Sequence, residues 1–458
     1  MKRLIVTTAL AAFCSICFAD VTVKMTEIKS GIKPMNAVNN GPILTKNSQV
    51  NDNFEAFKDL NIPYVRTHDA AFCESYGGEN TVDIRNIFPD FSKDENDPAS
   101  YDFLMTDYYL WTIHEAGSGI FFRLGQKIEH WLKKDNIMPP EDYAKWARIC
   151  EHIIRHYNCG WANGYYGGIK YWEIWNEADN DTQTWKTNPI CWGGPKEEFF
   201  KFYEVVSNHL HKCFPELEIG GPALCWDEVW AEDFLKYMSS HKVKLDFFSW
   251  HIYHVDPSEV AAKAVRIRRL LDKYGYGDTD SILDEWNYIR DFGDYYPYSV
   301  KVMNNLKGAA YVASVFQTCQ NAPVEMLMYY DIRPCVYCGL FDLYTFDPKE
   351  AYYAFYAWSK LSKLGKQLNV TVDERDVYAT AATDLKGRTS ILVSRYNEDN
   401  NVVVKKLVKV CVPMTDDTDV RVLLTDSAHK YTDVAPHIKD GVIELNLEPN
   451  SFAMIEIR

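Results

Sequence analysis

Short runs rich in apolar and β-branched residues alternate with segments of helical periodicity over most of this chain, and this alternation constrains its fold more than any other feature. Several runs are apolar on both faces, which is typical of parallel strands buried between a packed interior and outer helices. Between the runs, apolar residues recur every three to four positions, as at Trp146, Ile149 and Ile153. We expect eight strands, which are Ile32–Met35, Tyr64–Thr67, Ile120–Leu124, Ile169–Trp175, Leu217–Gly220, Phe247–Tyr253, Ser281–Trp286 and Glu325–Tyr330.

Eight strand–helix units predict an α/β fold of the (β/α)8 TIM-barrel type for residues 20–364. Periodicity alone leaves a doubly wound sheet open, and the motifs described below favour the barrel. From Val377 onward the pattern changes to short alternating strands separated by polar turns. Residues 365–458 are therefore predicted to form a β-sandwich, with residues 20–30 as a candidate extra strand of that sandwich.

The first residues have the pattern of a secretory signal peptide. Lys2 and Arg3 precede an apolar run from Leu4 to Phe18, and Ala19 offers a small residue for cleavage. We therefore expect residues 1–19 to be removed and the protein to be exported, to the periplasm or beyond. A transmembrane anchor is disfavoured because the run is short for a bilayer, and no later stretch of about 18 residues is apolar and uncharged, so we expect no membrane span.

The balance of charged residues limits the kinds of molecule that the protein can bind. The chain has 49 Lys and Arg against 64 Asp and Glu, which gives a formal net charge of −15. An acidic protein repels a phosphate backbone, so we expect no nucleic-acid partner. A polyanionic substrate would need a local basic pocket, whereas a neutral substrate would not. Nucleotide chemistry is disfavoured because no Gly-rich phosphate loop follows a strand.

Twelve cysteines are present, and ten remain once Cys14 and Cys17 leave with the signal peptide. Their spacing does not reveal a disulfide pairing. Cys335 and Cys338 form a C-x-x-C motif, which fits a local disulfide or a pair of free thiols. Because no second C-x-x-C and no paired histidine completes a metal site, we predict no metal and no other cofactor.

Two predicted strands each end in a glutamate beside aromatic residues. The segment Tyr171-Trp172-Glu173-Ile174-Trp175-Asn176-Glu177 leads to Glu177, and Ser281-Ile282-Leu283-Asp284-Glu285-Trp286-Asn287 leads to Glu285. The carboxyl ends of the strands form the active-site face of a TIM barrel. Either carboxylate alone could be an ordinary surface residue. Because Glu177 ends strand four and Glu285 ends strand seven, the two glutamates are predicted to face each other across the barrel mouth.

Two carboxyl groups in this position suit the cleavage of a glycosidic bond. One must be protonated, to give a proton to the leaving oxygen, and the other ionised, to attack the anomeric carbon or to activate water. Apolar neighbours such as Trp175 and Trp286, together with the opposing carboxylate, are expected to raise the pKa of the acid. Arg66 and Arg123, on strands two and three, are predicted to pair with buried carboxylates.

These motifs resemble the glycoside hydrolases of clan A, and most closely family 39, which holds β-xylosidases and α-L-iduronidases on a barrel with a β-sandwich. Further similar segments are Val65-Arg66-Thr67-His68, Gly220-Gly221-Pro222-Ala223, Phe248-Ser249-Trp250-His251-Ile252-Tyr253 and Gly339-Leu340-Phe341. The resemblance implies that Glu177 is the acid/base and Glu285 the nucleophile. It also implies that the sugar hydroxyls contact His68, Asn176, His251 and Tyr253. We add Trp286, beside Glu285, to the substrate-binding residues.

The chain departs from the family pattern at three places: Ala178 where Pro is usual, Asp69-Ala70 after His68, and Phe122-Arg123-Leu124-Gly125-Gln126 after strand three. These differences leave the chemistry in place but leave the substrate open. The sequence thus predicts a retaining exo-glycosidase acting on an oligosaccharide or polysaccharide, with β-xylosidase as the first choice. Iduronidase, galactosidase, arabinosidase and endo-glycanase types are alternatives, as is a catalytically silent carbohydrate-binding barrel. The oligomeric state does not follow from the sequence.

Overall fold

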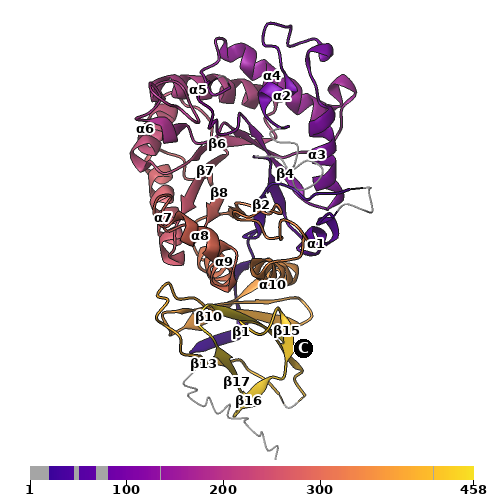
Figure 1. The fold of residues 1–458 in the computed structure, drawn as a ribbon, viewed down its shortest axis with the longest axis vertical. Coiled ribbons are helices and arrows are strands. Elements are labelled where there is room, and N and C mark those ends of the chain that lie inside the picture. Colours follow the sequence, from indigo (N-terminus) through magenta and orange to yellow (C-terminus); the bar gives the residue numbers. More distant parts are fainter. Residues whose placement is uncertain (1–19, 46–50, 69–80, 135, 416) are drawn as a thin grey trace, which may run out of the picture.

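A computed structural model describes residues 20–45, 51–68, 81–134, 136–415 and 417–458. The predicted signal peptide, residues 1–19, lies outside the described residues. Figure 1 shows two units, a barrel ringed by helices and a smaller domain of strands next to α9 and α10. Among the described residues, no helix is long and apolar enough to span a membrane.

Eight parallel strands close the barrel in chain order, which confirms the predicted TIM-barrel fold. The helices outside it bury their apolar faces against the strands, as α4 does with Trp146, Ile149 and Ile153. The barrel strands are β2 (Ala37–Asn39), β3 (Tyr64–Arg66), β4 (Gly119–Leu124), β5 (Tyr171–Ile174), β6 (Glu218–Leu224), β7 (Phe247–Tyr253), β8 (Asp280–Asn287) and β9 (Met326–Tyr329). The helices are α1 (Phe54–Asp59), α2 (Ile84–Ile87), α3 (Leu104–Glu115), α4 (Tyr143–Cys159), α5 (Lys196–Cys213), α6 (Glu228–Ser240), α7 (Pro257–Lys273), α8 (Tyr296–Met303), α9 (Leu306–Cys319) and α10 (Glu350–Leu364), with short 3-10 turns η1 (Pro98–Ser100), η2 (Trp161–Asn163) and η3 (Ala178–Asp181).

The first barrel strand lies later in the chain than predicted, at Ala37–Asn39 and not at Ile32–Met35. It contains one polar residue, Asn39, which is buried inside the barrel. The Asn39 side chain donates to Asp284 O at 2.7 Å and accepts from Arg66 Nη1 at 3.1 Å. Because its inward polar groups are paired by other strands, this strand needs no apolar run, and an apolar pattern could not reveal it.

The C-terminal domain is one ten-stranded sheet that encloses its own apolar cluster of residues such as Leu368, Ile391 and Ile455. β1 lies inside this sheet, antiparallel to β10 and parallel to β13, and Figure 1 shows it in indigo among orange and yellow strands. The sheet order is β15-β14-β18-β12-β11-β10-β1-β13-β17-β16. Its strands are β1 (Val21–Gly31), β10 (Lys366–Val372), β11 (Val377–Thr383), β12 (Thr389–Arg395), β13 (Lys406–Cys411), β14 (Val420–Thr425), β15 (Thr432–Val434), β16 (His437–Lys439), β17 (Val442–Leu447) and β18 (Ser451–Ile457).

The two domains share a continuous apolar cluster, in which Leu392 and Met454 of the sheet pack with residues of α9 and α10. At one edge of this junction lies Glu398, in the loop between β12 and β13. Its carboxylate accepts hydrogen bonds from Tyr288 at 2.9 Å and from Arg290, both in the loop after β8, and it forms an ion pair with Lys307 of α9 at 3.0 Å. These contacts bind the C-terminal domain to the catalytic face of the barrel.

We expect the Glu398→Ala variant to unfold with a free energy lower by about 1–3 kcal/mol, because it leaves Arg290 and Lys307 without their shared anion. Calorimetric melting measures this loss. The matched control is Glu374→Ala, because Glu374 forms a more exposed ion pair with Lys406 within the C-terminal domain. This control should stay within about 0.5 kcal/mol of the parent protein. Equal melting of the two variants would contradict a stabilising role for Glu398.

Candidate active site

A cavity of about 980 Å³ opens at the carboxyl ends of the barrel strands. Loops and strand ends from β3 to β9 all contribute to its wall, which is the usual construction of a TIM-barrel active site. Its lining residues are His68, Lys127, Ile128, His130, Trp131, Glu177, Asn180, Ile190, Cys225, Trp226, Tyr253, Glu285, Phe292, Tyr296, Tyr330, Arg333 and Tyr337.

Glu177 reaches the cavity from a sharp turn after β5. Trp175 and Glu177 both have left-handed backbone conformations, with φ of 74° and 51°, which cost each residue about 1–2 kcal/mol. The Trp175 indole offsets part of this cost by donating to Cys191 O at 2.9 Å, within a cluster that includes Trp146 and Trp192. The turn directs the Glu177 carboxylate toward the barrel axis, where the residue is 4% exposed.

Glu285 lies near the carboxyl end of β8, next to its pairing partner β7. Its Oε1 accepts the hydroxyl proton of Tyr253 at 2.6 Å, and its Oε2 lies 3.3 Å from Arg66 Nη1. His251, two residues before Tyr253 on β7, pairs in register with Glu285. Both β7 side chains lie on the inner face, as residues i and i+2 of a strand must.

His251 brings the two glutamates together. Its Nδ1 lies 2.7 Å from Glu177 Oε1 and 3.9 Å from Glu285 Oε2. One oxygen of each carboxylate and one His251 ring nitrogen all lie within 4.8 Å of one another. The structure thus places Glu177 and Glu285 on the same small volume at the barrel mouth.

Below this volume, Arg66 of β3 holds several buried carboxylates in place. Its side chain is fully buried and contacts carboxylates from two other strands, Glu173 on β5 at 2.7 Å and Asp284 on β8 at 3.0 Å. Its Nη2 donates to Asn176 Oδ1 at 2.7 Å. Arg123 is also paired, with Asp83 at 2.7 Å. Both pairings confirm the predicted bracing role of the two arginines.

Burial and neighbouring charges set the pKa values of Glu173, Asp284 and Arg66, and so decide which of these groups are protonated. Burial keeps the pKa of Glu173 well above its usual range, so Glu173 stays protonated and shares a hydrogen bond with Asp284. Burial also raises the pKa of Asp284, but the charges of Arg66 and His251 outweigh burial and lower it. For Arg66, burial lowers the pKa, and the surrounding carboxylates raise it above its ordinary value.

The two glutamates at the mouth differ in pKa, in the opposite sense to the sequence-based expectation. Burial, with help from the negative charge of Glu177, raises the pKa of Glu285 to about 7. Burial also raises the pKa of Glu177, but the hydrogen bond and charge of His251 outweigh it and lower the pKa below the usual value. Burial lowers the pKa of His251, but the charges of Glu285 and Asp284 raise it well above normal. The proton nearest to Glu177 is therefore held by His251.

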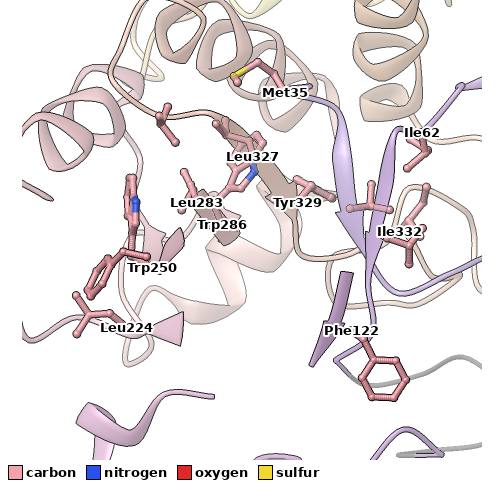
Figure 2. Packing of buried hydrophobic residues seen from close by; sticks show 14 of the residues in the cluster. Met35, Ile62, Phe122, Leu224, Trp250, Leu283, Trp286, Leu327, Tyr329 and Ile332 are labelled. Atoms are coloured by element: carbon pink, nitrogen blue, oxygen red, sulfur yellow. The ribbon is translucent and has the colours of Figure 1, made fainter. Parts of the chain in front are cut away.

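The remaining predicted substrate-binding residues fall into two groups. His68 and Tyr253 line the cavity, and Asn176 is buried beside Glu177 with its Nδ2 unpaired among the described residues. Trp286 lies elsewhere. It is fully buried, and its indole packs edge-on against Phe316 of α9 and Tyr329 of β9. Figure 2 labels Trp286 and Tyr329 in the buried hydrophobic cluster.

The structure corrects the assignment of Trp286. Adjacent residues of a strand point to opposite faces, so Trp286 must face the outer helices when Glu285 faces the axis. Trp175, too, packs beneath the turn and not against the cavity. Neither indole can contact a sugar held between the two glutamates.

Several lining residues were not singled out by sequence reasoning. They include Phe292 and Tyr296 after β8, Tyr337 after β9, and Lys127, His130 and Trp131 after β4. The available signal was their position within about ten residues after a strand, where barrel loops carry the binding site.

A closed (β/α)8 barrel with two close buried carboxylates at the carboxyl ends of its strands defines the class of barrel glycoside hydrolases. The model of the glycosyl hydrolases of family 39 matches residues 47–337. The chain therefore belongs to glycosyl hydrolase family 39, as its motifs had indicated.

Two curated relatives match a shorter segment. A β-xylosidase of Geobacillus stearothermophilus is 34% identical over 133 residues, which is 28% of this chain and 24% of the relative. An α-1,4-L-rhamnosidase of Formosa agariphila is 26% identical over 135 residues, which is 28% of this chain and 26% of the relative. The matched segment thus spans only about a quarter of either relative.

Solved structures match nearly the whole chain. A glucosidase of Croceicoccus marinus has a TM-score of 0.77 at 21% identity, and a β-xylosidase of Caulobacter crescentus has a TM-score of 0.70 at 15% identity. Each match covers 96% of this chain and 99% of the other. At these identities the likeness supports the fold of both domains.

Replacing Arg66 by Lys should lower the free energy of unfolding by about 3 kcal/mol or more, because one ammonium cannot reach all the buried acceptors that the guanidinium contacts. Denaturant unfolding at neutral pH measures the loss. Arg155→Lys is the control, because Arg155 forms a partly exposed pair with Glu151 on the same helix. A stability change no larger than that of the control would contradict the central role of Arg66.

Proposed function

We propose that the protein is a retaining glycoside hydrolase in which Glu285 is the nucleophile and Glu177 the acid/base. The observation that carries this proposal is the approach of the two carboxylates within 4.8 Å. Retaining enzymes hold their carboxyl groups about 5–5.5 Å apart, whereas inverting enzymes leave about 6.5–9.5 Å for a water molecule. The silent-barrel alternative is disfavoured because both carboxylates are present and converge.

In the first step, ionised Glu285 attacks the anomeric carbon and the glycosidic C–O bond breaks, while Glu177 passes a proton from His251 to the leaving oxygen. The product is a sugar ester of Glu285 and a free alcohol. In the second step, Glu177 takes a proton from water, and the resulting hydroxide equivalent displaces Glu285 from the sugar. Two displacements restore the original anomeric configuration.

His251 supplies the proton that Glu177 needs. Its Nδ1 is 2.7 Å from Glu177 Oε1, so the proton moves along an existing hydrogen bond as negative charge develops on the leaving oxygen. Esterification of Glu285 then removes a negative charge close to Glu177. Losing that charge favours the ionised form of Glu177, which is the form that must act as base in the second step.

For the substrate, we propose a β-xyloside cleaved from a chain end, with an exported protein acting outside the cytoplasm. Support comes from the segment shared with a β-xylosidase and from the net charge of −15, which suits a neutral sugar. The unpaired Nδ2 of Asn176 offers a donor to a sugar hydroxyl. The pattern of residues 1–19 supports export.

A second substrate class is favoured by the cations of the cavity wall. Lys127 and Arg333 line the cavity, whose only acidic lining residues among those described are Glu177 and Glu285. Such a wall would offset the acidic surface for a sugar that carries a carboxylate, as in the iduronidase-type alternative. A panel of aryl β-xylosides, arabinofuranosides, galactosides and uronides, with NMR of the first-formed anomer, distinguishes these candidates. Release of the inverted anomer from every accepted substrate would overturn the retaining mechanism.

Glu285→Gln should abolish turnover of every glycoside, because no nucleophile remains. Glu177→Ala should slow substrates with poor leaving groups by roughly 10²–10⁴-fold, and activated aryl glycosides far less, because only the former need a proton. Steady-state kinetics on one activated and one unactivated substrate measures the difference. The exposed control Glu259→Gln should leave both rates unchanged. Equal losses on the two substrates would remove Glu177 from the acid role.

The pH profile should report the ionisation of Glu285. Because its pKa is about 7 and only its ionised form attacks, kcat/KM should rise as pH increases through this value. Tyr253→Phe removes a donor to the ionised carboxylate, so the acidic limb should move to higher pH. Tyr296→Phe, which alters the cavity wall without a hydrogen bond to either glutamate, is the control. An acidic limb that Tyr253→Phe leaves in place would contradict the assignment of that limb to Glu285.

A further inference from the structure

The loop between β9 and α10 holds a second reactive group, which the proposed hydrolysis does not use. Cys335 and Cys338 lie in this loop with their sulfur atoms 4.0 Å apart. Tyr337, between them in sequence, lines the cavity, as does Arg333 two residues before Cys335. The two thiols thus flank Tyr337, a residue of the cavity wall, from just behind that wall.

The two sulfur atoms differ in burial, in hydrogen bonding and in the pKa of their thiols. Cys335 is half-buried, and its sulfur accepts backbone hydrogen bonds from Cys338 N at 3.4 Å and Gly339 N at 3.1 Å, which stabilise a thiolate. The hydrogen bond with the Cys338 thiol, together with the one from Cys338 N, lowers the pKa of Cys335 to about 7 against the effect of burial. Cys338 is fully buried, which raises the pKa of its thiol well above the usual value.

Asp331 adds a group that can accept the proton of the second thiol. It is buried, and the sulfur of Cys338 lies 3.6 Å from its Oδ1. Its other oxygen accepts from Asn40 at 2.8 Å and from Arg333 at 2.6 Å, so Oδ1 is held toward the sulfur atoms. An accessible thiolate beside a buried thiol and a carboxylate is the arrangement that thiol–disulfide exchange requires.

We propose that Cys335 and Cys338 form a redox-active pair whose oxidation to a disulfide changes the cavity wall at Tyr337. The oxidant is a small disulfide of the glutathione class. The Cys335 thiolate attacks one of its sulfur atoms and releases one thiol. Cys338 then loses its proton to Asp331 and attacks Cys335, which releases the second thiol. The protein dithiol thus loses two electrons and two protons, and the small disulfide becomes two thiols.

We expect closure of the disulfide to shift the loop. The sulfur atoms have to approach from 4.0 Å to about 2.05 Å. The carbonyls of the two cysteines are anchored from outside the pair, Cys335 O by Lys349 at 2.8 Å and Cys338 O by Tyr329 at 3.1 Å. Tyr337 lies between these anchors, so the backbone adjustment falls on a residue of the cavity wall.

The test oxidises the full-length protein with oxidised glutathione and compares it with the reduced form. We expect mass spectrometry of the alkylated protein to show a Cys335–Cys338 disulfide, and hydrogen exchange of the peptide around Tyr337 to change. Cys338→Ser should trap one glutathionyl group on Cys335, and Cys335→Ser should trap none at Cys338. Cys159→Ser, which removes an exposed cysteine at the end of α4, should behave like the parent.

The functional readout rests on the proposed glycosidase activity, whereas the mass and exchange measurements do not. We expect oxidation to change KM for an accepted aryl glycoside by about fivefold or more, with a smaller change in kcat, and Cys335→Ser to abolish the response. The proposal is overturned if both thiols remain alkylatable under oxidised glutathione, or if the disulfide forms with neither exchange nor KM altered. It is also overturned if added Zn²⁺ binds stoichiometrically and protects both thiols from oxidation, because Asp331, Cys335 and Cys338 would then be metal ligands.

Discussion

The contacts of one buried cation hold the catalytic end of the barrel together. Arg66 contacts Glu173, Asp284 and Glu285 from two other strands, and its guanidinium also bonds to Asn39 and Asn176. Buried charges are costly unless they are paired and hydrogen-bonded, so this group fixes β2, β3, β5 and β8 in one relative position. The planar fork of five donors suits the task, because it binds several acceptors in a single plane.

The proposed chemistry depends on which of the buried groups around Arg66 and at the barrel mouth are protonated. Glu173 keeps one, while Asp284 is ionised beside Arg66 and His251. The proton shared by Glu177 and His251 lies on the His251 side of their hydrogen bond. The acid of the proposed mechanism is therefore better described as a Glu177–His251 pair than as an isolated carboxyl group with a raised pKa.

Features that depend on the residues of one strand alone could be predicted from the sequence. The strands around Phe247–Tyr253 and Ser281–Trp286 were predictable because they are apolar on both faces, and both glutamates were predictable because they end such runs. The first strand was missed because its buried Asn39 pairs with groups on β3 and β8. The place of Trp286 could have been predicted from strand alternation, since Glu285 next to it faces inward. The low pKa of Glu177 could not, because His251 comes from a different strand.

The contacts of Glu398 affect how readily the barrel and the C-terminal domain can be exchanged between related proteins. An anion in a loop of the C-terminal domain neutralises Arg290 and Lys307 near the end of the strand that carries Glu285. A barrel separated from that loop would keep every residue of its catalytic mouth and still expose two unmatched cations beside it. Exchange of the two domains between related proteins, in nature or in the laboratory, therefore preserves more stability when the recipient barrel and the donated loop have complementary charges at this point.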